Sequence, residues 1–313
     1  MLETDKRCRA NAMTSLYIVR LRGEKMSDYK SGKWATKIID LQKDDGSWGY
    51  FHTLAMPTSG KAMATEQAIN RLRRLGFTKD DKPIQKALAY MHNCLANTLQ
   101  MPDPREKRMD WDIFIELMLA AWIRKFTDDD PLANDTAKKW RTVVEAAFQN
   151  GQYDPDVYIN TLYEIMKPKY GTVKRHKELL RIDYYYPISL LAGEIDENCE
   201  KAFFDFTMNS ETGYYYGFIG SVLRPPNDFC SKEASRYLSA IELYCDYPNR
   251  YCKGRLKPVV DWLNANRNAN GRWDMGAGVK DGTYFPLSDS WRTTELREND
   301  CTYRIEKIIS SLE

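Results

Sequence analysis

The chain has 313 residues, of which 43% are hydrophobic and 12% aromatic, enough to bury a sizeable core in one large domain or two ordinary ones. Its 46 lysines and arginines nearly balance its 44 aspartates and glutamates. The resulting net charge of +2 points to neither nucleic acid nor an anionic membrane surface as a partner.

The N-terminal stretch, residues 1–25, is polar and basic and differs in composition from the chain that follows. We predict a flexible arm or an over-extended start site there, and a single domain over residues 26–313. The seven cysteines are an odd number without a C-x-x-C pair, which indicates reduced thiols and a cytoplasmic protein. A stretch of about 18 apolar residues is absent, so we expect no membrane span.

Four segments, in chain order, place apolar residues at the three- and four-residue spacing of a helix, and alternating strand patterns are absent. They contain Ala68, Ile69, Leu72 and Leu75; Ile113, Leu117, Ala120 and Ala121; Ala234, Leu238, Ile241 and Cys245; and Cys301, Ile305, Ile308, Ile309 and Leu312. Asp130–Pro131 and Asp154–Pro155 have the form of helix starts, because aspartate caps free N–H groups and proline tolerates the first turn. The sequence therefore predicts amphipathic helices with capped ends.

A short signature closes several of these helical segments. It is clearest at Gln42–Trp48, of the form Q-x-x-x-G-x-W, and returns in weaker form at Ala147–Tyr153, Asn209–Tyr215 and Arg267–Trp273. Each unit reads as a cap, a helix, a glycine–aromatic turn and a returning helix. Such hairpins cannot bury their apolar faces alone, and closing a stack of them into a ring removes both exposed ends. We therefore predict an all-α fold, an α/α toroid of about five to six helical hairpins.

The signature resembles the QW repeat of the squalene cyclase and protein prenyltransferase superfamily, over roughly residues 30–313. The resemblance implies that the glutamine caps neighbouring helix ends and that the tryptophan stacks between hairpins, so Gln42 and Trp48 are interpreted as fold residues. The weaker copies have lost the glutamine. Through Asp110–Asp112 and Lys280–Arg292 the chain also resembles uncharacterised bacterial proteins that carry this repeat, which implies no activity.

The chemical motifs of that superfamily are incomplete in this chain. Its cyclases use a D-x-D-D acid, whereas the nearest match, Thr127–Asp130, lacks the first aspartate and precedes Pro131 as a helix cap would. Its prenyltransferases bind zinc through an Asp-x-Cys pair and a distant histidine. Asp228 and Cys230 have that local form, but no histidine lies near them in sequence. They are kept as a weak candidate zinc pair, with a buried cysteine beside a cap as the alternative.

In a toroid the second helix of each hairpin lines the centre, so we expect polar residues at those helix starts to face a cavity. Each can also be a simple helix cap. We select Asp110, Asp112 and Asp300 as candidate catalytic carboxylates. The linker Asp274–Arg292 is long enough to be a lid or binding loop, with ordinary packing across the ring as the alternative. The candidate ligand-binding residues are Glu66, Trp111, Tyr158, Lys280, Asp281, Tyr284, Asp289, Trp291, Arg292 and Arg304.

Three functions follow as hypotheses. The first is a cyclase- or prenyltransferase-like protein that binds a small molecule in a central cavity rimmed by carboxylates and aromatics; its activity is not specified. The second is a non-catalytic scaffold that holds a protein partner, in which case the centre is expected to be filled and shallow. The third is a carbohydrate-active enzyme, in which two carboxyl groups about 5–10 Å apart serve as acid and base.

Overall fold

The computed structural model describes residues 28–53, 63–105, 110–171 and 180–313. Helices carry the fold, and in these four ranges β-type pairing is limited to two isolated bridges that join Tyr184, Tyr214 and Ile219. The prediction of an all-α fold is confirmed. The predicted arm at residues 1–25 lies outside the described residues.

The helices follow one another along the chain with short connections. Their bounds are α2 (Lys33–Ile39), α3 (Thr65–Arg74), α4 (Lys82–Leu95), α5 (Trp111–Arg124), α6 (Pro131–Ala147), α7 (Pro155–Tyr170), α8 (Tyr185–Leu190), α9 (Glu197–Asn209), α10 (Lys232–Tyr244), α11 (Arg250–Arg255), α12 (Lys257–Ala265) and α13 (Thr294–Leu312). Two 3₁₀ turns, at Tyr29–Ser31 and Ala277–Val279, complete the regular structure of the described ranges.

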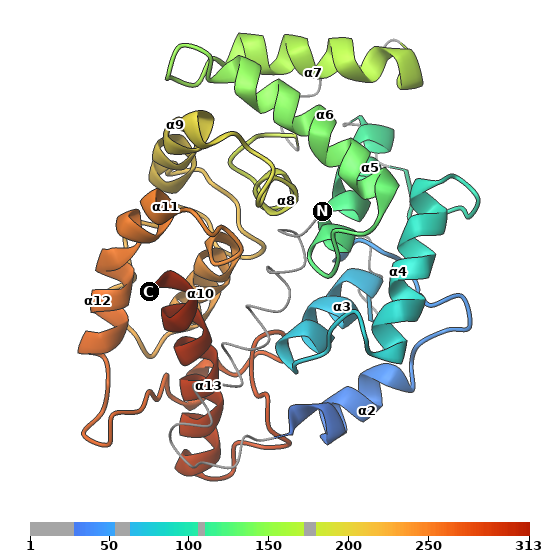
Figure 1. Cartoon of the computed structure of the whole chain (residues 1–313). Coiled ribbons are helices and arrows are strands. Elements are labelled where there is room, and N and C mark those ends of the chain that lie inside the picture. Colours follow the sequence, from blue (N-terminus) through green and yellow to red (C-terminus); the bar gives the residue numbers. More distant parts are fainter. Residues whose placement is uncertain (1–27, 54–62, 106–109, 172–179) are drawn as a thin grey trace.

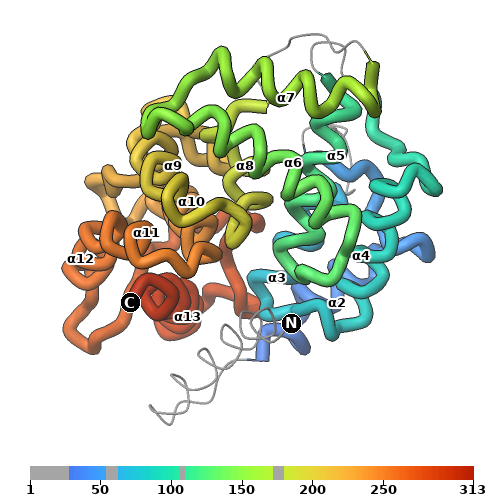
Figure 2. The backbone as a smooth tube through the Cα atoms, turned by 45° about the horizontal axis from the view of Figure 1, so that its top comes forward, coloured from blue at the N-terminus to red at the C-terminus, as the bar shows by residue number. Residues whose placement is uncertain are grey.

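Helices from distant parts of the chain meet in the middle of the molecule. Figure 1 shows α3, α5, α8, α10 and α13 around the centre, with α2, α4, α7, α9, α11 and α12 at the periphery. Helix α6 packs between α5 and α7, and α5 also packs against α4 and α8. The tube in Figure 2 shows the same order from a second direction, with the ends of the described chain, α2 and α13, on the same side. A single hydrophobic core joins residues from Tyr29 to Leu312. The closed ring of a toroid stays a prediction.

The predicted apolar positions form the buried faces of these helices. Every one of them on α3, α5 and α13 is buried, as are Ala234, Leu238 and Ile241 on α10, whereas Cys245 is half-buried. The predicted caps are also present. Asp130 accepts hydrogen bonds from the N–H groups of Leu132 and Ala133, and Asp154 accepts two at the start of α7 in the same way.

The first and last copies of the signature make the same contacts. The indole N–H groups of Trp48 and Trp273 each donate to a carbonyl ten residues earlier, at 2.6 Å in both cases. Their backbone N–H groups donate to Thr65 and Thr302, at 3.0 and 3.2 Å. Each turn thereby joins the end of an outer helix to a threonine on an inner helix, and these contacts are mechanical, as expected for fold residues.

The turn at Gly46 is also held against the next hairpin. Gly46 has a φ of +92°, and a Cβ atom there would lie 2.3 Å from the carbonyl oxygen of Lys86 on α4. The Gln42 side chain donates to the carbonyl oxygens of Gly46 and Pro83, at 3.0 and 2.8 Å. Only glycine permits both the positive φ and the close approach, so this turn fixes the distance between α2 and α4.

The structure corrects two expectations: that Asp300 stands at the start of an inner helix, and that Tyr158 faces a central cavity. Helix α13 begins at Thr294, so Asp300 lies inside the helix and not at its start. Helix α7 lies at the periphery in Figure 1, and the short α8 takes the central place. Sequence reasoning missed α8 because six residues, Tyr-Tyr-Pro-Ile-Ser-Leu, are too few to show a helical period.

Two further predictions concern the cysteines and the absence of a membrane span. Each of the six cysteines in the described ranges is a free thiol. None of the described helices is long and apolar enough to cross a membrane.

Candidate functional site

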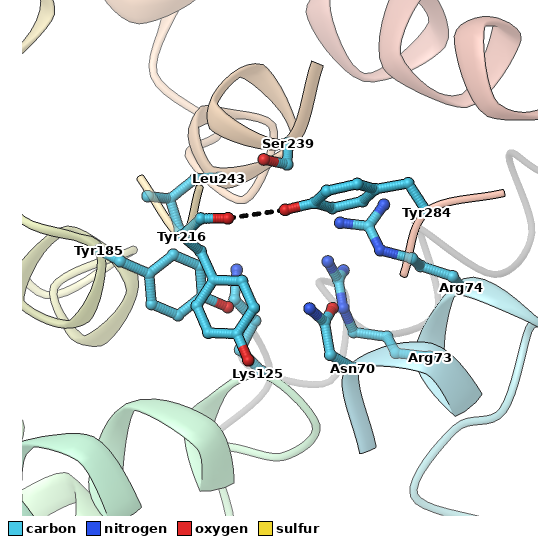
Figure 3. A pocket seen from close by; sticks show the side chains of 9 residues that line it. All are labelled: Asn70, Arg73, Arg74, Lys125, Tyr185, Tyr216, Ser239, Leu243 and Tyr284. Atoms are coloured by element: carbon cyan, nitrogen blue, oxygen red, sulfur yellow. Dashed lines mark hydrogen bonds between the residues drawn. The ribbon is translucent and has the colours of Figure 1, made fainter. Parts of the chain in front are cut away.

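A small polar pocket lies where the central helices converge (Figure 3). Its space amounts to about 230 Å³ when open solvent at the mouth is included, but the enclosed part holds only about one water molecule. Three cations, three tyrosines and three further residues line it: Arg73, Arg74, Lys125, Tyr185, Tyr216, Tyr284, Asn70, Ser239 and Leu243. The pocket is therefore too small for a hydrocarbon chain and is basic in character.

The cations of the pocket come from the C-terminal ends of two inner helices. Arg73 and Arg74 are in the last turn of α3, and Lys125 is the C-cap of α5. Such positions suit cations, because the carbonyl groups at a helix C-terminus carry partial negative charge. The same end of α10 supplies Ser239 and Leu243. The fold thus turns several helix C-termini toward one point.

Two carboxylates neutralise part of this charge. Glu242 on α10 accepts from Arg74 at 2.5 Å and from Arg304 on α13 at 2.6 Å. Lys125 donates to Asp246 at 2.5 Å. Burial alone would raise the pKa of Glu242, but Arg304 and Arg74 lower it to about 2, so this carboxylate is ionised at neutral pH.

The pocket wall contains a tyrosine between two guanidinium groups. The ring centroid of Tyr284 lies 4.5 Å from Arg74 and 5.0 Å from Arg304, and its hydroxyl donates to the backbone carbonyl of Tyr216 at 2.7 Å. Tyr216 has a φ of +54°, which is rare for an aromatic residue. Burial raises the pKa of Tyr185 and of Tyr216, so both phenols stay neutral.

Several nitrogen donors of the pocket have no partner within the described chain. The buried Nε atoms of Arg73 and Arg74 make no hydrogen bond. No ion pair or hydrogen bond joins the Arg73 guanidinium to any described residue, and the same holds for hydrogen bonds of the Asn70 amide. The Arg74 side chain is only 8% exposed, so water cannot easily compensate its free N–H group. Cations and free donors together make the pocket suited to an anion.

Comparisons of the chain with models of known protein families, with curated proteins and with solved structures find no match. The geometry of the pocket is therefore the basis for a functional assignment.

Of the predicted ligand-binding residues, Tyr284 lines this pocket, and Arg304 contacts the Tyr284 ring and Glu242 next to it. Glu66 lies close behind it as a fully buried carboxylate. It accepts from Trp122 at 2.9 Å, from Tyr186 at 2.5 Å and from two donors of Thr53. With four hydrogen bonds from neutral donors, Glu66 is satisfied by the fold itself.

Trp111 and Tyr158 are packing residues in the structure. Trp111 is buried and stacks on Phe114, with ring centroids 5.7 Å apart. Tyr158 belongs to the peripheral α7, packs against Trp140 of α6 and donates to the carbonyl oxygen of Leu180. Neither lines the central pocket.

The candidate catalytic carboxylates do not line the pocket either. Asp110 accepts from the hydroxyl of Tyr163 at 2.8 Å and makes no side-chain cap to α5. Asp112 is exposed and pairs with Arg105 at 2.6 Å. Asp300 is fully buried on α13 and accepts five hydrogen bonds, including one from Trp291 at 2.7 Å. All three carboxylates have structural partners.

The remaining linker candidates lie at the surface or in turns. Asp281 accepts from the backbone N–H groups of Thr283 and Tyr284, both at 2.9 Å, and so shapes the turn that carries Tyr284. Asp289 accepts from the N–H of Lys33 at 2.8 Å, at the start of α2. Two more candidates of this linker are exposed, namely Lys280 and Arg292.

The candidate zinc pair forms an ordinary turn. Asp228 accepts from the backbone N–H of Cys230 at 2.9 Å, and the Cys230 thiol faces the carbonyl oxygen of Asp274 at 3.6 Å. Burial and the nearby Asp228 and Asp274 raise the pKa of Cys230. Across the described ranges, no group of three or more histidine, cysteine, aspartate or glutamate side chains could hold a metal ion.

Sequence reasoning missed most of the pocket, because it searched the starts of the inner helices. The basic residues that mark the pocket lie at the opposite, C-terminal ends of these helices. The run Arg71–Arg74 closes α3 just before Gly76, and Lys125 closes α5. Basic residues at helix ends are common on solvated faces. They indicate a pocket only when the structure shows that these helix ends converge.

Proposed function

We propose that the chain is an α/α toroid that binds a small anion, or the phosphate or carboxylate group of a small molecule, in its central pocket, whose space is about 230 Å³ when the open mouth is included. The observation that carries the proposal is the unbalanced charge of the pocket. Arg74 and Arg304 share Glu242, Lys125 pairs with Asp246, and Arg73 has no ion-pair partner in the described chain. Among these six residues the cations exceed the carboxylates by two.

The toroid part of the proposal is supported by the elements that supply the pocket. Its lining comes from α3, the end of α5, α8 and α10, together with the segments that carry Tyr216 and Tyr284. Residues separated by more than 200 positions in the chain thus meet at one point, as expected when hairpins surround a centre.

An anion is favoured over a neutral ligand for an energetic reason. Guanidinium groups bind phosphate and carboxylate through charge-assisted hydrogen bonds, which are roughly twice as strong as neutral ones. The free Nε atoms of Arg73 and Arg74 and the Asn70 amide supply the donors. Carboxylates do not line the pocket, which favours an anion over the cation or the sugar that a rim of acids would bind.

Titration with inorganic phosphate in an isothermal calorimeter tests the proposal. We expect saturable binding by the full chain, and we expect Arg73→Gln to weaken it at least about tenfold, because one charge-assisted contact is lost. Arg236→Gln is the matched control, since Arg236 is an exposed arginine in the middle of α10. Affinity should stay unchanged in this control.

A non-catalytic scaffold is the second candidate, and the small size of the central pocket favours it. The calorimetric result separates the two. If the unaltered chain shows no saturable phosphate binding, or if Arg236→Gln weakens binding as much as Arg73→Gln, the anion site is excluded and the scaffold is the better description.

A further inference from the structure

Lys125 differs from the other cations of the pocket because it is an amine that can be freed of its proton. Its side chain is only 2% exposed, and it packs beneath the ring of Tyr185 with Nζ 5.6 Å from the ring centroid. In Figure 3, Lys125 lies beside Tyr185 and Tyr216, across the pocket from Arg73 and Arg74. A buried amine thus faces two groups that can hold an anion.

Asp246 gives this amine a proton acceptor. The carboxylate lies 2.5 Å from Lys125 Nζ and is 32% exposed, so one side of it contacts the amine and the other contacts solvent. A proton that moves from Lys125 to Asp246 can therefore leave the pocket through water. The other cations of the pocket are arginines, which do not lose a proton in this way.

We propose that Lys125 is a nucleophile that forms an imine with a small oxo acid, whose carboxylate is held by Arg73 and Arg74. The proposal rests on the anion site proposed above and adds the reacting group of its ligand. Glyoxylate is the compound to test, since its aldehyde and its carboxylate are joined directly; because the enclosed part of the pocket holds only about one water molecule, this ligand also occupies the open mouth. In this arrangement the carboxylate contacts Arg73 and Arg74, and the carbonyl carbon points across the pocket toward Lys125, which lies on the opposite wall.

The chemical step balances within the pocket. Asp246 takes one proton from the Lys125 ammonium group, and the freed electron pair of Nζ forms a bond with the carbonyl carbon. The carbonyl oxygen then leaves as water, carrying the two remaining Nζ hydrogens, while a C=N bond replaces the C=O bond. Asp246 returns its proton to the imine nitrogen. The step neither oxidises nor reduces the ligand, so it needs no further reactant.

The electrostatic environment supports this chemistry. Burial lowers the pKa of Lys125, the partner Asp246 opposes that change, and the neighbouring Arg73 lowers the pKa further. The net direction is downward, which enlarges the fraction of neutral amine at a given pH. Lysines that form Schiff bases are activated in the same way, by desolvation or by an adjacent cation.

The experiment uses the full chain, glyoxylate and cyanoborohydride, which reduces an imine to a stable secondary amine. Peptide mass spectrometry then measures the modified fraction at each lysine. Lys257 is the internal reference, because it is exposed and pairs with a single aspartate on its own helix, Asp261. We expect the modified fraction at Lys125 to exceed that at Lys257, because only Lys125 lies beside the arginines that would hold the carboxylate.

Two variants keep the test independent of folding. Lys125→Arg retains the positive charge opposite Asp246 but cannot form an imine, so modification at this position must vanish while the Lys257 level is unchanged. Arg73→Gln retains the amine but weakens the hold on the carboxylate, so we expect modification of Lys125 to fall about tenfold. The melting temperature of each variant shows whether it is folded.

The outcomes separate this inference from the anion site on which it rests. Modification of Lys125 that does not exceed that of Lys257 overturns the imine, and saturable phosphate binding in the same preparation leaves the anion site standing. Selective modification of Lys125 that phosphate fails to suppress overturns the anion site as the place where the carboxylate is held. Selective modification that phosphate suppresses supports both.

Discussion

Asp300 and Glu242 are both carboxylates of the central helices, and their surroundings differ in kind. Asp300 accepts hydrogen bonds from Tyr29, Leu287, Ser288 and Trp291, all between 2.7 and 2.9 Å, and four of the five donors bind its Oδ2 atom. These donors are neutral groups from the first described turn and from the linker before α13. The carboxylate holds three distant segments together.

Glu242 is a single carboxylate with several cations around it. Arg74 and Arg304 contact its two oxygens, and Arg73 adds to the positive field around it. Nitrogen atoms of Arg73 and Arg74 remain without partners there. The contrast distinguishes a fold centre from a binding centre: donors and acceptors match at Asp300, whereas donors are in excess around Glu242.

Asp300→Ala tests the first half of this contrast and has the largest expected effect. It removes the acceptor that Tyr29, Ser288 and Trp291 share, and each hydrogen bond lost in this partly buried network is costly. We expect the free energy of unfolding to fall by about 3–5 kcal/mol, the range seen when a buried polar network loses its acceptor. Urea denaturation measures the change.

Asp289→Ala is the control for that substitution. Asp289 belongs to the same linker and is exposed, and it accepts from the backbone N–H of Lys33. Its loss should cost about 1 kcal/mol, the typical value of one hydrogen bond. Equal losses in the two variants would contradict the assignment of Asp300 as the acceptor that organises this region.

Glu242→Gln tests the excess of positive charge around Glu242. It should lower the free energy of unfolding and raise the affinity for phosphate. Removing the carboxylate leaves Arg74 and Arg304 buried without a counter-charge, so we expect a loss of about 3 kcal/mol in the free energy of unfolding. The same excess of positive charge should raise the affinity for phosphate. Calorimetry on the folded variant, with the exposed Glu233→Gln of the same helix as control, measures both quantities.

The affinity result is the informative one. A lower affinity in Glu242→Gln, with Glu233→Gln unchanged, would mean that Glu242 orients the arginines for binding. The distinction between a fold centre and a binding centre would then not hold at Glu242.

The pH dependence of the free energy of unfolding tests whether Glu242 is ionised in its pairs with the arginines. The pKa of Glu242 is lowered to about 2 in the folded chain, against an ordinary value of 4.5. Its contribution to stability is therefore present above pH 4.5 and is lost as the pH falls from there toward 2. In urea denaturation at several pH values, the difference between the unaltered chain and Glu242→Gln should shrink across this window. A difference that stays constant from pH 6 to pH 3 would contradict the ionised pairing.

These centres also show what sequence could predict and why. The helices, their buried faces and the turn at Gly46 follow from local rules, since periodicity, capping and positive φ involve neighbouring residues only. The pairing of Arg74 with Glu242 joins residues 168 positions apart. Each of the two looks like a solvated residue on a helix when it is considered alone.

The candidate catalytic carboxylates, Asp110, Asp112 and Asp300, did not predict the position of the pocket for a related reason. Sequence identifies Asp300 as an acid on an apolar helix, but its five donors come from residues that only the fold brings near. Tyr284, a predicted ligand-binding residue, lines the pocket, and Arg304 contacts its ring, whereas the role of both residues in binding stays a prediction. The balance of charge between segments is not visible locally.

Arg73→Gln has the smallest expected effect on stability and completes the comparison. Arg73 has no hydrogen-bond or ion-pair partner in the described chain, and its charge adds to an existing excess. We therefore expect the free energy of unfolding to change by less than about 0.5 kcal/mol, with an increase as the favoured sign, because repulsion from neighbouring cations is relieved. Urea denaturation without phosphate measures this change. A loss of about 2 kcal/mol or more would show that Arg73 supports the fold, as Asp300 does, and that its free nitrogen is not reserved for a ligand.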